Sequence, residues 1–171
     1  MEYGNKPVDG GNLILSEAEK NQLLEKYPEA KKIIKKFIGS NELIKGTKRY
    51  CLWIDEAQLD FATSIPDVRC RIEACKEMRL NSRDSGARKL AQVPYQFREF
   101  REAKKDLFVV PSVSSENREY LPVDLRQSDT VISNLAFGIY DSDEWVLAII
   151  CSTLHSLWAV SYTHLTLPTS R

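Results

Sequence analysis

The sequence lacks the features that mark membrane-spanning, secreted or zinc-binding proteins. No apolar run reaches the roughly 18 residues needed to span a bilayer; the longest, Trp145 to Val160, is interrupted by hydroxyl side chains and a histidine. The N-terminus has no signal-peptide pattern. The four cysteines, at positions 51, 70, 75 and 151, form no C-x-x-C pair and match no common zinc spacing. These absences predict a cytoplasmic chain with reduced thiols and no membrane partner.

Groups that carry catalysis are also scarce. The chain has no glycine-rich loop after a strand that would hold a dinucleotide, S-adenosylmethionine or a phosphate, and no H-E-x-x-H motif. Only two histidines occur, and His155 lies beside Leu154, Leu157 and Trp158, as a helix-packing residue does. We therefore expect no catalytic residue, no metal and no bound cofactor in this chain, and whether the chain is itself an enzyme stays open.

What is present is the composition of an ordinary globular protein. The chain has 171 residues, of which 43% are hydrophobic and 28% are charged, and its formal net charge is zero. Neither disorder nor a fibrous class fits these values. The length allows one principal domain with a real core, but not two full-sized domains and a linker.

Helical signals dominate the first half of the chain. Ser16 to Glu19 has the S-x-x-E form of a capping box, which predicts a helix starting there. Pro28 is expected to open a second helix, with apolar residues at helical spacing as far as Phe37, ending at Gly39. After Pro66 a long helix is expected with its apolar residues on one face. Its other faces are expected to hold Arg69, Arg71, Lys76 and Arg79.

Strands are expected where branched and aromatic residues lie between turn formers. Five such runs occur, and a hairpin loop at Lys45 to Lys48 is expected to join the first two. The runs are Glu42 to Ile44, Arg49 to Ile54, Leu107 to Val110, Arg118 to Val123 and Thr130 to Ser133. The predicted fold class is α+β, a mixed sheet with flanking helices in a single domain.

Charge is unevenly distributed along the chain. Between Arg69 and Lys105 there are eleven basic residues against five acidic ones, so the rest of the chain carries the compensating negative charge. A stretch of this kind can neutralise DNA phosphates, and interleaved amide and aromatic side chains can read or stack on bases. A solvated helix face has the same composition. Charge alone leaves both interpretations open.

A polar loop, Pro111 to Tyr120, is expected between two strands. Its serines and Arg118 can contact phosphate oxygens or base edges. A capped turn without a ligand is the alternative interpretation.

Six motifs occur in order between about Gly4 and Ala159. In order and spacing they resemble the C-terminal part of the MmeI-like DNA methyltransferases, which are the single-chain type II restriction-modification enzymes and their relatives. The motifs are Gly4 to Leu13, Tyr27 to Ala30, Phe37 to Ser40, Arg49 to Trp53, Arg88 to Ala91 and Pro111 to Glu116. Together they are far more specific than any one motif alone.

The resemblance implies a bacterial or archaeal enzyme that transfers a methyl group from S-adenosylmethionine to the exocyclic N6 amine of adenine. The Asn-Pro-Pro-aromatic motif of the catalytic domain is absent from this sequence, as is the nuclease domain that several members carry. The part present resembles the target-recognition domain, which holds duplex DNA and selects the site whose adenine is flipped for methylation. Its expected partners are duplex DNA and a methyltransferase domain of the same protein.

With the resemblance included, the basic stretch and the following loop become the expected DNA-contacting surface. Arg and Lys side chains are expected to hold phosphates, while Asn81, Gln92 and one or two arginines are candidates for base edges. The expected DNA-binding residues are Asn81, Ser82, Arg83, Arg88, Lys89, Gln92, Tyr95, Arg98, Arg101, Ser114, Ser115 and Arg118.

The expected organisation has four parts: a linker from a missing methyltransferase domain (1–15), the target-recognition domain (16–142), the start of a C-terminal helical region (143–159) and a tail (160–171). The tail resembles translated sequencing-adapter read-through, so we treat it as an artefact. Both ends are expected to be truncations. The alternative is a stand-alone interaction module whose basic stretch binds an acidic partner.

Overall fold

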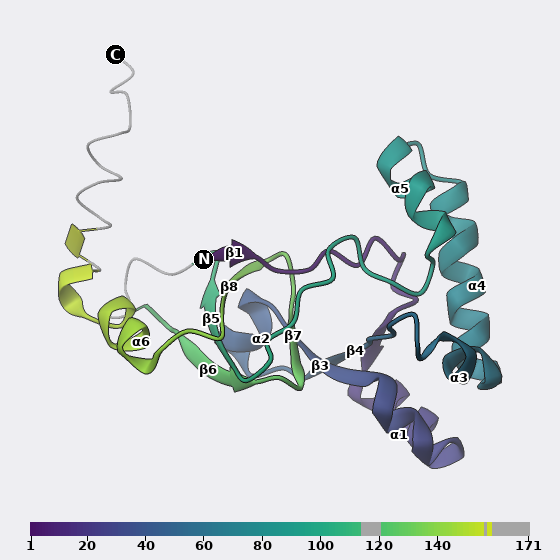
Figure 1. The fold of residues 1–171 in the computed structure, drawn as a ribbon, viewed down its shortest axis with the longest axis horizontal. Helices are drawn as coiled ribbons and strands as arrows, with labels where there is room; N and C mark the ends of the chain where they lie inside the picture. The colour runs from purple at the N-terminus through teal and green to yellow at the C-terminus, as the bar shows by residue number, and fades with distance from the viewer. Residues whose placement is uncertain (114–120, 156, 159–171) are drawn as a thin grey trace.

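The computed structural model describes residues 1–113, 121–155, 157 and 158, which form two four-stranded sheets and surrounding helices (Figure 1). The strands are β1 (Glu2–Tyr3), β2 (Ile14–Ser16), β3 (Ile34–Ile38), β4 (Arg49–Leu52), β5 (Asp106–Pro111), β6 (Asp124–Gln127), β7 (Thr130–Ile132) and β8 (Ala136–Tyr140). The helices are α1 (Glu17–Lys26), α2 (Ser40–Lys45), α3 (Leu59–Ser64), α4 (Pro66–Leu80), α5 (Ser85–Lys89) and α6 (Glu144–Ile150), with 3-10 turns η1 (Pro28–Ile33) and η2 (Leu90–Gln92). The predicted α+β class is confirmed, but the strands form two sheets rather than one.

The first sheet is mixed and has the strand order β2-β4-β3-β7. Strand β3 pairs antiparallel with β4 and parallel with β7, where Phe37 lies opposite Val131. The larger hydrophobic cluster packs against this sheet and includes Leu52 and Trp53. The rings of Phe37 and Trp53 both meet Phe97 edge-on, at centroid distances of 5.7 and 5.3 Å. This core joins the sheet to α1, α3 and α4.

The second sheet, β1-β8-β5-β6, is antiparallel throughout. Its central strand β5 buries Leu107 to Val110 completely or nearly so. A smaller cluster, which includes Leu107, Val109 and Ile132, supports it. Strands β7 and β8 follow one another in the chain but belong to different sheets, so the turn between them joins the two.

The N-terminal segment, residues 2–13, ties the two sheets together. The amide of Gly4 donates to Ala136 O (3.1 Å) and that of Asn5 to Ile132 O (2.6 Å). The side chain of Asn5 is fully buried and bonds both the carbonyl and the amide of Arg101, each at 2.9 Å. Residues 1–15, expected as a linker, thus supply β1 and the start of β2.

Helix α1 begins where the sequence predicted. Ser16 accepts from the amide of Glu19 at 3.2 Å, and the Glu19 carboxylate accepts from the amide of Ser16 at 2.8 Å. This reciprocal pair satisfies two amide donors that the first helical turn leaves free. Lys26 ends the helix just before Pro28.

Two predicted elements are wrong, and a third is wrong in the part that the structure describes. The helix expected from Pro28 to Gly39 is a 3-10 turn as far as Ile33 and then strand β3, because β4 and β7 supply partners on both of its edges. The strand expected at Glu42 to Ile44 lies in α2, so the loop before β4 joins a helix to a strand. Residues 121–123 are not in a strand; β6 starts at Asp124, and residues 118–120 lie outside the described part.

The long helix after Pro66 is confirmed as α4, with Pro66 in its first turn and its buried face formed by Val68, Ile72 and Cys75. One residue differs from expectation: Arg79 is on the buried face and is fully inaccessible to solvent. In the described part of the chain, no helix combines the length and apolar character that crossing a membrane requires.

Helix α6 leaves the second sheet after Asp141, where the C-terminal helical region was expected. Trp145 and Ile149 are more than half exposed. Residues 160–171 lie outside the described residues.

Candidate nucleic-acid interface

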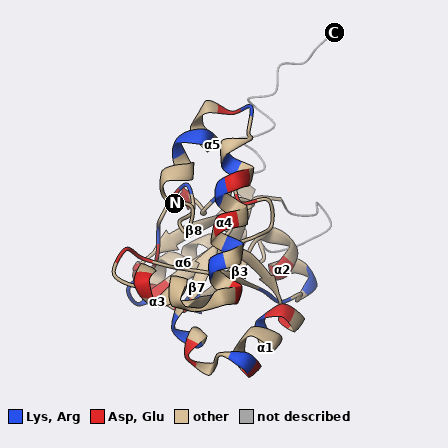
Figure 2. Ribbon diagram, turned by 90° about the vertical axis from the view of Figure 1, so that its right-hand side faces the viewer, with Lys and Arg blue, Asp and Glu red and all other residues tan. Residues whose placement is uncertain are grey.

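The basic stretch, residues 69–105, starts within α4 and continues through α5, η2 and the segment that follows them. Asp84 caps α5, since its carboxylate accepts from the Gly86 amide at 2.9 Å. Arg88 turns back and donates to the carbonyls of Ser82 (2.8 Å) and Arg83 (2.9 Å), which closes the connection between the two helices. Figure 2 shows basic residues along α5, whereas basic and acidic residues alternate along α4.

Most of the expected DNA-binding residues of this segment are on the surface. Asn81, Arg83, Arg88, Lys89 and Gln92 are exposed, and Ser82 is half-buried. They come from the end of α4, from α5 and from η2, which contact one another. The structure therefore gathers six of the expected residues at the end of α4 that lies farthest from α1 (Figure 1).

Arg98 and Arg101 form a second group beside the N-terminal segment. Arg101 donates to Tyr3 O at 2.9 Å, and its Nε lies 3.1 Å from Glu2 Oε2. The Arg98 amide donates to Lys6 O at 2.9 Å. A hollow of about 630 Å³, lined by Glu2, Lys6, Arg101 and neighbouring residues, lies here.

Tyr95 does not belong to either surface group. Its side chain is 8% exposed and lies in the larger hydrophobic cluster with Phe97. Tyr95 was expected among the base-stacking residues because basic and amide residues surround it in the sequence, but that local pattern carries no information about which residues face the core. In this structure the ring is not available to stack on a base.

The polar loop after β5 is described only at its start. Ser112 donates through its hydroxyl to Leu135 O at 2.6 Å, and its amide donates to the Ser40 hydroxyl at 2.9 Å. These bonds fix the loop entrance against the first turn of α2. Ser114, Ser115 and Arg118 lie outside the described residues.

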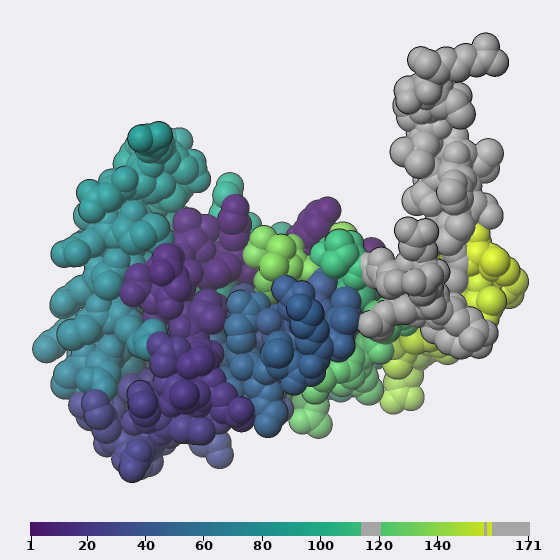
Figure 3. All heavy atoms as spheres, turned by 180° about the vertical axis from the view of Figure 1, so that it is seen from behind, coloured from purple at the N-terminus to yellow at the C-terminus, as the bar shows by residue number. Residues whose placement is uncertain are grey.

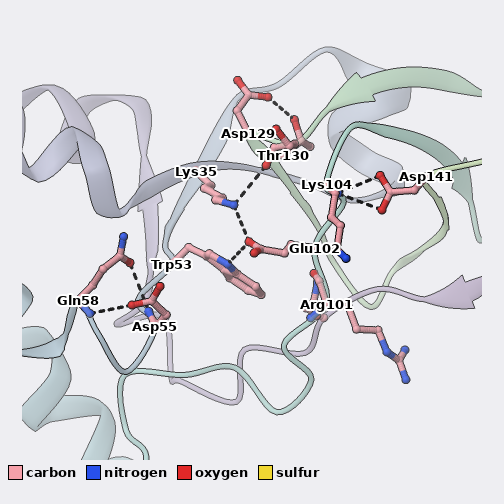
Figure 4. A network of polar contacts seen from close by, with 12 residues as sticks. Lys35, Trp53, Asp55, Gln58, Arg101, Glu102, Lys104, Asp129, Thr130 and Asp141 are labelled. Carbon is pink, nitrogen blue, oxygen red and sulfur yellow. Dashed lines mark hydrogen bonds and ion pairs between the residues drawn. The ribbon is translucent and has the colours of Figure 1, made fainter.

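A polar network ties the segment that carries Arg98 and Arg101 to the mixed sheet (Figure 4). Glu102 accepts from Lys35 Nζ at 2.7 Å and from Trp53 Nε1 at 2.9 Å. Burial of Glu102 opposes its ionisation, but the hydrogen bond and charge of Lys35, helped by Trp53, lower its pKa overall. The ring of Phe100 stacks on Trp53 at 4.1 Å. The carboxylate stays charged at neutral pH and anchors the segment.

A basic pocket that the sequence did not predict is lined by residues of both sheets. It has a volume of about 390 Å³ and is lined by four cations from β3, the α2–β4 connection, β4 and β6. Each cation lies near a carboxylate; Arg49, for example, is 2.8 Å from Glu42. The four are Lys36, Lys48, Arg49 and Arg126. Only Lys48 and Arg49 are adjacent in the sequence; Lys36 and Arg126 come from elsewhere in the chain, so no local signal could have joined all four.

The cysteines are free thiols, as predicted. Burial raises the pKa of Cys51, and raises that of Cys75 to about 11, so both are protonated at neutral pH. Among the described residues no three His, Cys, Asp or Glu side chains are grouped to hold a metal ion.

Comparison with known proteins agrees with the fold. DNA methyltransferase A of Bacillus subtilis (strain 168) is 44% identical over 158 residues, which are 92% of this chain and 18% of that protein. The solved structure of the type IIL restriction-modification enzyme MmeI in complex with DNA matches with a TM-score of 0.85 and 33% identity, over 92% of this chain and 21% of that one. The chain thus spans about a fifth of the length of these relatives.

The family model described as MmeI, target recognition domain, matches residues 1–162. That range covers both sheets, the basic segment and the N-terminal segment that joins them. The chain therefore belongs to the family of MmeI target recognition domains.

Proposed function

We propose that this chain recognises duplex DNA on behalf of an adenine-specific N6 methyltransferase of a restriction-modification system. The observation that carries the proposal is the match over 92% of the chain to an MmeI structure solved with DNA. The methyl transfer itself, to an adenine flipped out of the duplex, is assigned to a catalytic domain outside this chain.

S-adenosylmethionine is proposed as the methyl donor of that larger enzyme. The described residues do not fit it. The β3–α2 connection has a single glycine, Gly39, whose amide already donates to the Glu42 carboxylate at 2.8 Å. A glycine-rich turn between a strand and a helix, which lets the backbone approach the cofactor closely, is what an adenosine cofactor needs at such a position. No step of the reaction is therefore assigned to this chain's residues.

The residues gathered at the end of α4, on α5 and on η2, called the α5 group from here on, supply the proposed phosphate contacts. Arg83, just before α5, and Arg88 and Lys89 within it are exposed cations. Asn81 and Gln92 flank them with amides that can pair with base edges. Arg98 and Arg101 extend the proposed surface toward the N-terminal segment, and Ser114, Ser115 and Arg118 are retained as proposed contacts from the loop after β5.

Charge reversal tests this surface. Arg88→Glu with Lys89→Glu should weaken binding of a labelled mixed-sequence duplex and reduce the slope of log affinity against log salt by about 2, one unit per lost phosphate contact. Fluorescence anisotropy between about 50 and 200 mM salt measures both quantities.

The matched control reverses Lys31 and Lys32, an adjacent exposed pair in η1. In Figure 1, α1, which η1 follows in the chain, lies at the opposite end of α4 from α5. An unchanged slope for the Arg88/Lys89 variant, or an equal loss in the control, would reject the α5 surface. Polyglutamate that competes as well as duplex DNA would favour the acidic-partner alternative.

A further inference from the structure

Arg79 is the residue whose surroundings the sequence least predicted. It lies in the last turn of α4, with no exposed surface, although it belongs to the most basic stretch of the chain. A buried charge is costly unless its donors are satisfied. Its contacts therefore indicate what its burial achieves.

All five N–H groups of its guanidinium have acceptors. Nε donates to Val8 O at 2.8 Å, Nη1 to two carbonyls at 2.9 Å each, and Nη2 to two carbonyls at 2.9 and 2.7 Å. Every acceptor is a backbone carbonyl, and together they come from two segments: Pro7 and Val8 before β2, and Leu90, Val93 and Gln96 after α5. A guanidinium has five donors in one plane, whereas an ammonium has three at one point.

The segment after α5 has little regular secondary structure to hold its backbone in place. It contains the three-residue turn η2 and then an irregular path through Pro94. Tyr95 and Phe97 anchor it on the core side. Arg79 binds three of its carbonyls, while Arg88, Lys89 and Gln92 of the same region are exposed to solvent.

The guanidinium of Arg79 also holds the N-terminal segment, whose backbone has an unfavourable conformation at Val8. Val8 has φ of +45°, a region that a β-branched residue rarely adopts. Such conformations persist where surrounding contacts fix them. Figure 3 shows the N-terminal atoms between those of α4–α5 and those of β3–β4.

We propose that Arg79 is a positioning residue for DNA binding: it fastens the segment after α5 to the N-terminal segment and thereby sets the spacing between the α5 cations and Arg98. This inference rests on the proposed function. Burial lowers the pKa of Arg79, yet an arginine stays protonated at any physiological pH, so the fastening does not depend on pH.

Arg79→Lys in the full chain is the first test. Lysine keeps the charge but leaves at least two carbonyls without a donor. We expect about tenfold weaker binding of the mixed-sequence duplex and a shallower salt dependence, measured where circular dichroism shows the variant to be folded. Arg69→Lys, an exposed position of the same helix, should change neither. A purely structural role would lower the melting temperature but leave affinity and salt slope per folded molecule unchanged, and that result would overturn the proposal.

Chemical rescue gives an independent readout. Millimolar guanidinium chloride should restore DNA binding to Arg79→Ala, while sodium chloride at the same concentration should not. Equal effects of the two salts would count against the proposal.

Hydrogen exchange on the unaltered chain tests the positioning role of Arg79 even if both variants fail to fold. The amides of residues 6–10 and 90–98 should open together and should both be protected when the duplex binds. Protection of 90–98 alone would overturn the proposal. If reversal of Arg88 and Lys89 weakens DNA binding while these Arg79 tests fail, the proposed function stands and only the positioning role is lost.

Discussion

The two sheets have equal numbers of strands but unequal cores. Among the described residues, eighteen buried side chains cluster against the mixed sheet and only six against the antiparallel one. Three helices cover the first, whereas the second leaves Tyr3 and Leu125 largely exposed. From this difference we infer that stability is concentrated in the half of the molecule formed by the mixed sheet and its helices, including α4. The half formed by the antiparallel sheet depends on strand pairing and on the N-terminal segment.

A matched pair of leucines provides the strongest test of that comparison. Leu52 of β4 and Leu107 of β5 are both completely buried, each in a different cluster. Truncation to alanine should cost between about 2 and 5 kcal/mol, with Leu52→Ala near the upper end because its dense surroundings collapse less into the cavity. Urea unfolding measures both. Equal costs would show that cluster size does not matter here.

Gly4→Ala probes how far the antiparallel half depends on the N-terminal segment. A Cβ at Gly4 would lie 2.6 Å from Ile132 O, so the backbone must move. We expect a loss of about 1–3 kcal/mol, typical of overpacking, with faster amide exchange in β1 and β8. Gly86→Ala is the control, since its Cβ would meet only the side chain of Asp84, at 3.3 Å. A stable Gly4→Ala protein with unchanged exchange would contradict the tie between the segment and the sheets.

The smallest expected effect concerns the cap of α1, which belongs to the mixed-sheet half. Hydrogen bonds from the Ser16 backbone, from Arg71 and from the Ser16 hydroxyl lower the pKa of Glu19 to about 2. Because the folded pKa is below the unfolded one, this stabilisation is present above about pH 4.5 and is lost as pH falls toward 2.

Glu19→Gln should therefore cost about 0.5–1 kcal/mol at neutral pH and flatten the acid limb of the stability curve; the carboxylate is partly exposed, so its contribution is small. Thermal unfolding between pH 2 and 7 measures it. Glu17→Gln in the same turn should cost less, and an equal loss would show that general charge, not the cap, is responsible.

Local signals in the sequence were sufficient where the chain satisfies its own backbone groups. The capping box at Ser16, Pro66 at the start of α4 and the branched residues of β4 and β5 each act within a few residues, and the elements they predicted are confirmed. The α+β class followed from these elements. The exposed cations of α5 lie within the stretch of excess positive charge that the sequence singled out.

Local sequence patterns gave wrong predictions where the structure of a segment depends on contacts with residues far away in the sequence. Apolar residues from Ala30 to Phe37 fit helical spacing, yet their second half is a strand because β7, almost one hundred residues later, pairs with it. The buried positions of Tyr95 and Arg79 were missed for the same reason: both residues lie in a stretch rich in polar and charged side chains, and most of the groups that bury them lie elsewhere in the chain.

The sequence by itself determined the class of fold, the starts of α1 and α4, the family resemblance and the region of excess positive charge, because these depend on composition and on contacts within a few residues. Only the tertiary structure decided which charged side chains are exposed and which are buried. It exposes Arg83, Arg88 and Lys89, buries Arg79 among five carbonyls, and gathers four cations from separate elements into one pocket. The physical reason is that a charged side chain is buried or exposed according to the acceptors around it, and here segments far apart in the chain provide those acceptors.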